Sequence, residues 1–208
     1  MTPANNSLPC AALASPKVRG YNVERMPSAQ ITWRDVLEMP EDGNRYEAIG
    51  GKLYVTPSPS ETHQRTSGLL FVELFRLLDE PGYGRVYAAP FGVQHPVTGE
   101  GTQPDLLFVS TERLHIVHED SIRGAPDLVI EIASPSTAHQ DRTVKLDFYR
   151  RLGVAEYWDV DADAEQVLAW PLAAGATEPE RYSDRVPVRL GGRIVGEIEL
   201  ARVFERAR

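Results

Sequence analysis

The chain has 208 residues, of which 42% are hydrophobic, and this suffices for one domain with a sizeable core. Its formal net charge of −8 excludes the generally basic surface that supplies most of the affinity of nucleic-acid-binding proteins. Any nucleic-acid role must therefore rest on a local patch, on bound metal or on a partner. The sequence has no apolar run of about 18 residues, so it predicts no membrane span.

The first 28 residues are rich in Pro, Ala, Ser and Asn. They lack the basic and apolar regions of a signal peptide, so we interpret residues 1–28 as a disordered leader. Cys10 is the only cysteine and lies in this leader, which rules out an intrachain disulfide and a cysteine zinc site. These features favour a reducing, cytoplasmic setting.

The region after the leader predicts a short helix over 33–39, a tight hairpin over 44–55 and a long apolar helix over 61–79. Gly50-Gly51 lies between two short β-prone runs and indicates the hairpin turn. Ser60 is a natural N-cap for the long helix.

The middle of the chain predicts two central strands. Residues 84–95 are typical of one or two strands and precede a turn at 96–101, whereas 111–122 is irregular. The runs 105–109 and 127–133 are apolar at nearly every position, as in strands that are covered on both faces.

A helix over 139–152 and a strand over 155–160 follow, and the remainder alternates short β-like pieces. This order predicts an α/β fold, with a mixed α+β sheet, a helix on each of its faces and an antiparallel C-terminal extension. We expect one domain over 29–172, and we expect 173–208 to be a β-rich extension of the same domain.

Three ionisable residues stand where a folded chain normally places apolar ones. Asp105 opens one predicted central strand, and Glu131 interrupts the other. Lys145 shares the apolar stripe of the following helix with Phe148 and Tyr149, at about 100° per residue. A buried charge is costly unless it is paired or holds a metal, so the three residues together indicate a site.

Strand geometry separates Asp105 from Asp127, which also follows a proline. Asp127 and Glu131 are four residues apart on one strand and thus about 13 Å apart, too far to bind one ion. Asp105 on an adjacent strand can reach Glu131, because neighbouring strands are about 4.8 Å apart. We therefore pair Asp105 with Glu131.

Other polar residues allow two readings. Lys145 could pair with Asp141 one turn earlier on the helix while its stem carries the ammonium to solvent. His63 could be a packing or capping residue, and Gln64 is no more specific. Glu47, in the first arm of the hairpin, could face solvent.

These residues together resemble the Uma-type family of putative restriction endonucleases, within the PD-(D/E)XK nuclease superfamily. The similarity covers about residues 30 to 172, and its parts are specific in combination. The matching stretches are Tyr46 to Leu53, Pro57 to Gln64, Gln103 to Leu106, Gly124 to Thr137, Asp141 to Leu146 and Gly153 to Trp158.

The resemblance implies a restriction-endonuclease-like core in which Asp105 and Glu131 hold Mg²⁺, with Mn²⁺ as a substitute. The superfamily's lysine normally lies two residues after the second acid, where this chain has Ala133, and the matching lysine is Lys145. Glu47 matches a further acid that binds a second metal or a water. His63, Gln64 and Asp141 are expected to support the site.

The predicted function is hydrolysis of DNA phosphodiester bonds by a metal-dependent homodimer. Two alternatives stay open. The −8 charge and Ala133 favour a non-catalytic interaction module that retains a nuclease fold. A hydrolase of small phosphoesters would need no basic groove and also suits an acidic protein.

Overall fold

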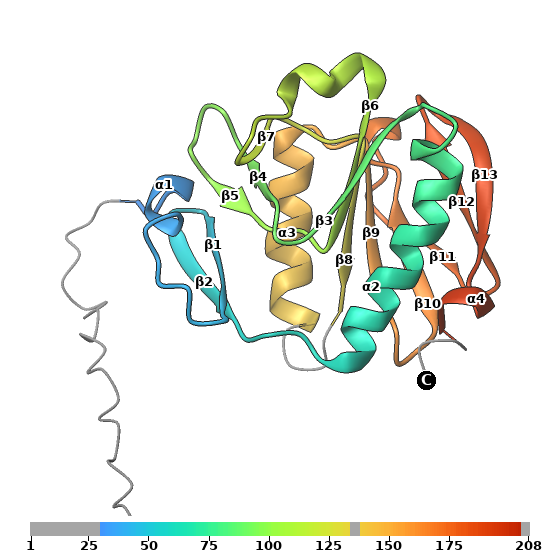
Figure 1. Ribbon diagram of the computed structural model, residues 1–208, viewed down its shortest axis with the longest axis horizontal. Helices are drawn as coiled ribbons and strands as arrows, with labels where there is room; N and C mark the ends of the chain where they lie inside the picture. The colour runs from blue at the N-terminus through green and yellow to red at the C-terminus, as the bar shows by residue number, and fades with distance from the viewer. Residues whose placement is uncertain (1–29, 134–137, 205–208) are drawn as a thin grey trace, which may run out of the picture.

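The computed structural model describes residues 30–133 and 138–204, with side chains for 30–133 and 143–204, so the predicted leader lies outside the described residues. The elements of the described chain are shown in Figure 1. In chain order they are α1 (Trp33–Val36), β1 (Arg45–Ile49), β2 (Lys52–Thr56), α2 (Glu61–Leu74), η2 (Phe75–Asp79), β3 (Gly84–Ala88), β4 (Gly92–Gln94), β5 (Gly101–Thr102), β6 (Leu106–Ser110), η3 (Thr111–Ile116), β7 (Ser121–Arg123), β8 (Leu128–Ile132), α3 (Ala138–Leu152), β9 (Glu156–Asp161), β10 (Gln166–Trp170), η4 (Leu172–Ala174), β11 (Glu180–Tyr182), β12 (Arg185–Leu190), β13 (Arg193–Glu199) and α4 (Ala201–Phe204).

The strands are divided among three sheets. The main sheet has the order β11-β10-β9-β8-β6-β3, in which β8 and β9 are parallel and the other neighbours antiparallel. A second sheet has the order β2-β1-β5-β4-β7, and β12 pairs only with β13 among the described strands. The mixed α+β class is confirmed, but the expected single sheet is not what forms. The hairpin β1–β2 instead pairs with β5, in a segment predicted as a turn.

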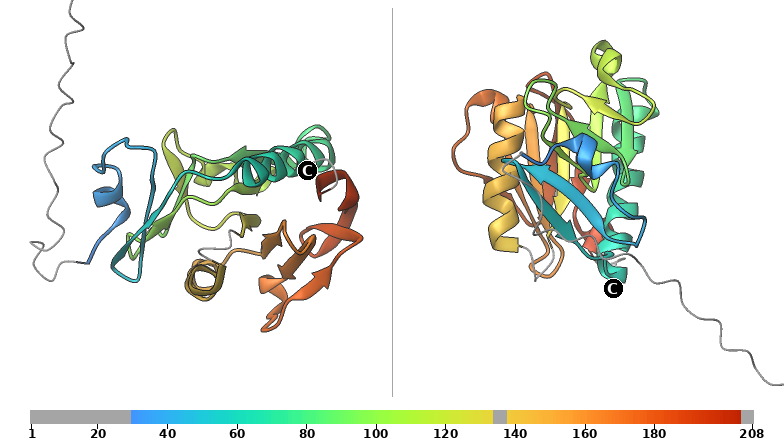
Figure 2. Two further views of the ribbon diagram at one scale, coloured as in Figure 1. Left: turned by 90° about the horizontal axis from the view of Figure 1, so that it is seen from below. Right: turned by 90° about the vertical axis from the view of Figure 1, so that its left-hand side faces the viewer.

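Helices α2 and α3 cover opposite faces of the main sheet, as Figures 1 and 2 show. On one face Leu70 and Leu74 of α2 pack in one cluster with Phe108. On the other face Phe148 of α3 packs in a second cluster with Val129. Every residue of β6 and β8 is buried, which confirms the prediction of two central strands covered on both sides.

Local signals place the start of α2 correctly. The Ser60 hydroxyl accepts the His63 backbone N–H at 3.2 Å and caps the helix. Beyond Leu74 the predicted helix continues as the π-helix η2 to Asp79. Helix α1 ends at Val36, earlier than expected. Among the described residues no helix is long and apolar enough to cross a membrane.

The hairpin β1–β2 is held against α3 by one buried carboxylate. Gly50 and Gly51 form its turn with positive φ angles of 59° and 73°, which glycine adopts without strain. The Gly50 N–H donates to Glu100 Oε1 at 2.7 Å. Arg151 of α3 donates to both oxygens of Glu100, at 2.8 and 3.0 Å. This link fixes the distance between the strand that carries Glu47 and the helix that carries Lys145.

Candidate metal-dependent active site

Asp105 and Glu131 meet at the ends of β6 and β8. The register Leu106↔Ile130 places the two acids one step further along these antiparallel strands, facing one another. Asp105 Oδ2 accepts the backbone N–H of Ile132 at 2.7 Å, which ties its carboxylate to β8. Asp105 is 2% exposed and Glu131 8%. The structure therefore brings together the two acids that strand geometry paired.

Lys145 lies between two acids from different sheets. Its Nζ is 3.0 Å from Glu47 Oε2 and 3.1 Å from Glu131 Oε1. Lys145 and Glu47 are both buried. The alternative readings of a lysine that extends to solvent and of a solvent-facing Glu47 are therefore wrong. Glu47 Oε1 also accepts the Gln103 backbone N–H at 2.9 Å, which orients this carboxylate.

His63 contacts the acid cluster directly. Its Nε2 lies 3.0 Å from Asp105 Oδ2, so this side chain does more than pack or cap. Gln64, the next residue, is exposed and lines a neighbouring cleft rather than the cluster. The side chain of Asp141 lies outside the described residues. Asp127 lies away from this cluster, with Ser110 N and Arg113 as its partners.

Three further residues of the site were missed in the sequence. Arg45 Nη2 lies 2.8 Å from Asp105 Oδ1, and Arg45 precedes Glu47 by two residues, a spacing that puts both on one strand face. The Tyr149 hydroxyl donates to Glu131 Oε1 at 2.6 Å. Asp159 of β9 is buried and pairs in register with Glu131. A strand period of two could have signalled Arg45, and the i,i+4 spacing of Lys145 and Tyr149 on one helical stripe could have signalled the tyrosine.

The acid of Asp105 is held ionised. Burial raises its pKa, but the hydrogen bond from His63 and the charge of Arg45 lower it more, and the pKa of Asp105 falls to about 2. Asp105 is thus an anion at neutral pH, although it is almost completely buried.

Glu131 has the opposite shift. Burial raises its pKa, the ammonium of Lys145 counteracts this, and repulsion from Asp105 and Glu47 adds to it, so that the pKa of Glu131 rises to about 7. The pKa of Lys145 is raised as well, because attraction from these carboxylates outweighs its burial. Lys145 keeps its proton and contacts Glu47 and Glu131, while Arg45 contacts Asp105, so two cations face three acids.

The donor chemistry of the cluster suits a hard divalent cation, because carboxylate oxygens are the ligands that Mg²⁺ prefers. Asp105 Oδ1 is buried and accepts no hydrogen bond within the described part of the chain, although Arg45 Nη2 is close by. As the described side chains now stand, no group of three or more His, Cys, Asp or Glu could hold a metal ion.

The fold that carries these residues is a mixed sheet between two helices, with facing acids at the ends of its central strands. The chain belongs to the Uma2 family, described as "Putative restriction endonuclease", whose match covers residues 33–201. The fold is also similar to the crystal structure of a putative nuclease belonging to DUF820 from Anabaena variabilis. That comparison gives a TM-score of 0.70 at 20% sequence identity, over 86% of this chain and 99% of the other. No curated protein matches the sequence.

Proposed function

We propose that this protein is a metal-dependent endonuclease that hydrolyses phosphodiester bonds in DNA. The observation that carries the proposal is the buried Lys145 between Glu47 and Glu131, beside the ionised Asp105. Several buried charges in one place are costly to stability, and such clusters occur where chemistry needs them. Membership of the Uma2 family, described as "Putative restriction endonuclease", supports the same reaction class.

The residues have distinct roles in this proposal. Asp105, Glu131 and Glu47 would hold Mg²⁺, or Mn²⁺ in its place. Bound there, the ion supplies positive charge that polarises the phosphate and makes hydroxide available at neutral pH. The Lys145 ammonium orients the attacking water and stabilises negative charge that develops on the phosphate. His63 and Tyr149 position the carboxylates of Asp105 and Glu131, which they contact.

The acids can bind a metal ion only if the side chains of Arg45 and Lys145 move away from them. Arg45 stands 2.8 Å from Asp105 Oδ1, and Lys145 contacts two of the three acids. Both side chains are long and can retain contact with a phosphate after moving aside. We propose that Arg45 leaves Asp105 when the site is loaded.

The test is cleavage of circular and linear DNA with Mg²⁺ or Mn²⁺. The natural chain, Asp105→Ala and Lys145→Ala are purified in parallel. We expect cleavage by the natural chain alone, and equal residual activity in all three would point to a contaminant. Calorimetry with Mn²⁺ is expected to show binding that Asp105→Ala abolishes.

A non-catalytic interaction module is the second candidate. It is favoured by the ion pairs that Lys145 and Arg45 already form with the acids in the described structure. Absence of Mn²⁺ binding by the natural chain would select this candidate. A homodimeric state and a cytoplasmic location also remain proposals, and light scattering at several protein concentrations tests the first of them.

A further inference from the structure

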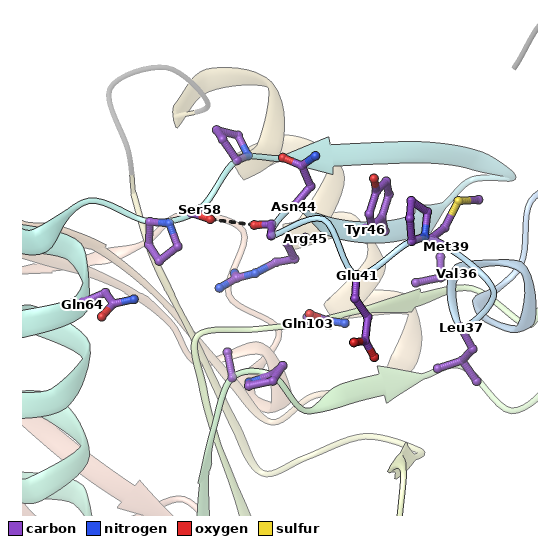
Figure 3. Close-up of a pocket in the computed structure, with 16 residues that line it drawn as sticks. Val36, Leu37, Met39, Glu41, Asn44, Arg45, Tyr46, Ser58, Gln64 and Gln103 are labelled. Carbon is purple, nitrogen blue, oxygen red and sulfur yellow. Dashed lines mark hydrogen bonds between the residues drawn. The ribbon is translucent and has the colours of Figure 1, made fainter. Parts of the chain in front are cut away.

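An open cleft of about 620 Å³ lies beside the acid cluster. Figure 3 shows that residues from the segment after α1, from the start of β1 and from α2 surround it. Val36 and Leu37 contribute apolar walls, Gln64 comes from α2, and Gln103 lies between them. The volume falls within the range of about 300–1,000 Å³ that small-molecule sites occupy.

Two contacts join the cleft to the cluster. Arg45 lines the cleft and reaches Asp105 Oδ1 with its guanidinium. Gln103 also lines the cleft, and its backbone N–H donates to Glu47 Oε1. A ligand in the cleft would therefore lie against two residues that contact the acids directly.

The chemistry of the walls suits a nucleoside better than a phosphate. Arg45 and Glu41 are the charged residues that line the cleft, and their formal charges cancel. With Arg45 on Asp105, as in the described structure, the cleft has no free cation among its lining residues. If Arg45 leaves Asp105 as proposed above, it can contact the phosphate next to the nucleoside. The side-chain amides of Gln64 and Gln103 each offer a donor and an acceptor, as the edge of a nucleobase requires. Apolar neighbours can cover the flat face of such a base.

We propose that this cleft receives one unstacked nucleoside of the DNA strand, next to the bond that is cut. Leu37 packs on the base, and the amides of Gln64 and Gln103 hydrogen-bond to its edge. A base inside a duplex is stacked, so the cleft favours single-stranded or locally opened DNA. This inference rests on the proposed nuclease function and names the form of its substrate.

Binding without cleavage tests the proposal. Fluorescence anisotropy measures the Kd of the full chain for a labelled short oligothymidylate, in Ca²⁺ instead of Mg²⁺. An abasic strand of the same length carries the same phosphates without the bases. We expect binding to weaken about tenfold for the abasic strand, the scale of one lost base stack. The variant Leu37→Ala, which removes the side chain that packs on the base, should weaken binding of oligothymidylate in the same direction. Val97→Ala, at another strongly exposed position outside the cleft, is the matched control and should bind normally.

Gln64→Ala provides a second variant that leaves the apolar walls intact, and it should weaken oligothymidylate binding but not binding of the abasic strand. Three results would overturn the proposal: equal affinity for the two strands, normal binding by both Leu37→Ala and Gln64→Ala, or no binding by the natural chain. Base-dependent binding without any cleavage in Mg²⁺ would contradict the proposed nuclease activity. It would still support the nucleoside site in the cleft.

Discussion

Two Pro-Asp dipeptides precede the two central strands, and their carboxylates have different surroundings. Asp105, before β6, is almost fully buried and contacts His63, Arg45 and the backbone N–H of Ile132. Asp127, before β8, is only partly buried. Its Oδ2 accepts the backbone N–H of Ser110 at 2.7 Å, and its Oδ1 pairs with a partly exposed Arg113 at 3.3 Å.

The difference shows that local sequence does not decide how deeply a carboxylate is buried or which side chains contact it. Both aspartates follow a proline and begin an apolar strand, and both receive a backbone hydrogen bond from the neighbouring strand. Only Asp105 lies where a second sheet and α2 bring two further polar side chains against it. Substitutions at and around the two positions can test this distinction.

The largest effect is expected from Asp105→Asn. The amide keeps the size of the side chain but removes the negative charge that a cation site needs. We expect the initial rate of plasmid cleavage in Mg²⁺ to fall about 1,000-fold, the scale seen when a principal catalytic group is lost. An unchanged cleavage rate in this variant would show that Asp105 is no more important for cleavage than Asp127.

Lys145→Met should have the next largest effect, a fall in cleavage rate of about 100-fold. It removes the ammonium that bridges Glu47 and Glu131 while retaining an unbranched side chain. The matched control is Arg150→Met, an exposed position on the same helix, which should cleave normally. Equal loss in both variants would indicate that α3 itself had been disturbed.

The raised pKa of Glu131 should make the free energy of unfolding depend on pH. Its pKa is about 7 in the folded chain and 4.5 ordinarily, so the folded state binds the extra proton between these values. The free energy of unfolding should therefore fall as pH rises from about 4.5 to about 7, by on the order of 2 kcal/mol. Urea unfolding at several pH values measures this slope, which Glu131→Gln should lack. An identical slope in the variant would show that other groups cause it.

The smallest effect is expected from Asp127→Asn. This change weakens the pairing with Arg113 but keeps an oxygen that can accept the Ser110 N–H. We expect a loss of about 0.5–1 kcal/mol in the free energy of unfolding, and a normal cleavage rate. Thermal unfolding and the plasmid assay measure the two quantities, and a large loss of activity would contradict the separation drawn between the two aspartates.

Much of the fold was predictable because its signals are local. Ser60 marks the start of α2, Gly50-Gly51 marks the hairpin turn, and continuous apolar runs mark β6 and β8. The pairing of β1 with β5 was not predictable, since it joins segments about 50 residues apart through a strand of only two residues. That pairing determines which side of the hairpin faces the main sheet.

The sequence by itself indicated three of the buried charges, because Asp105 begins an apolar strand and Glu131 and Lys145 interrupt apolar patterns whose phase can be counted. Only the tertiary structure decided which charges compensate one another. Glu47 and Arg45 reach the cluster from a second sheet, and no periodicity within one element reports such a contact. The physical reason is that the energy of an ion pair depends on the distance between its charges and on their burial, and both are set by packing between elements.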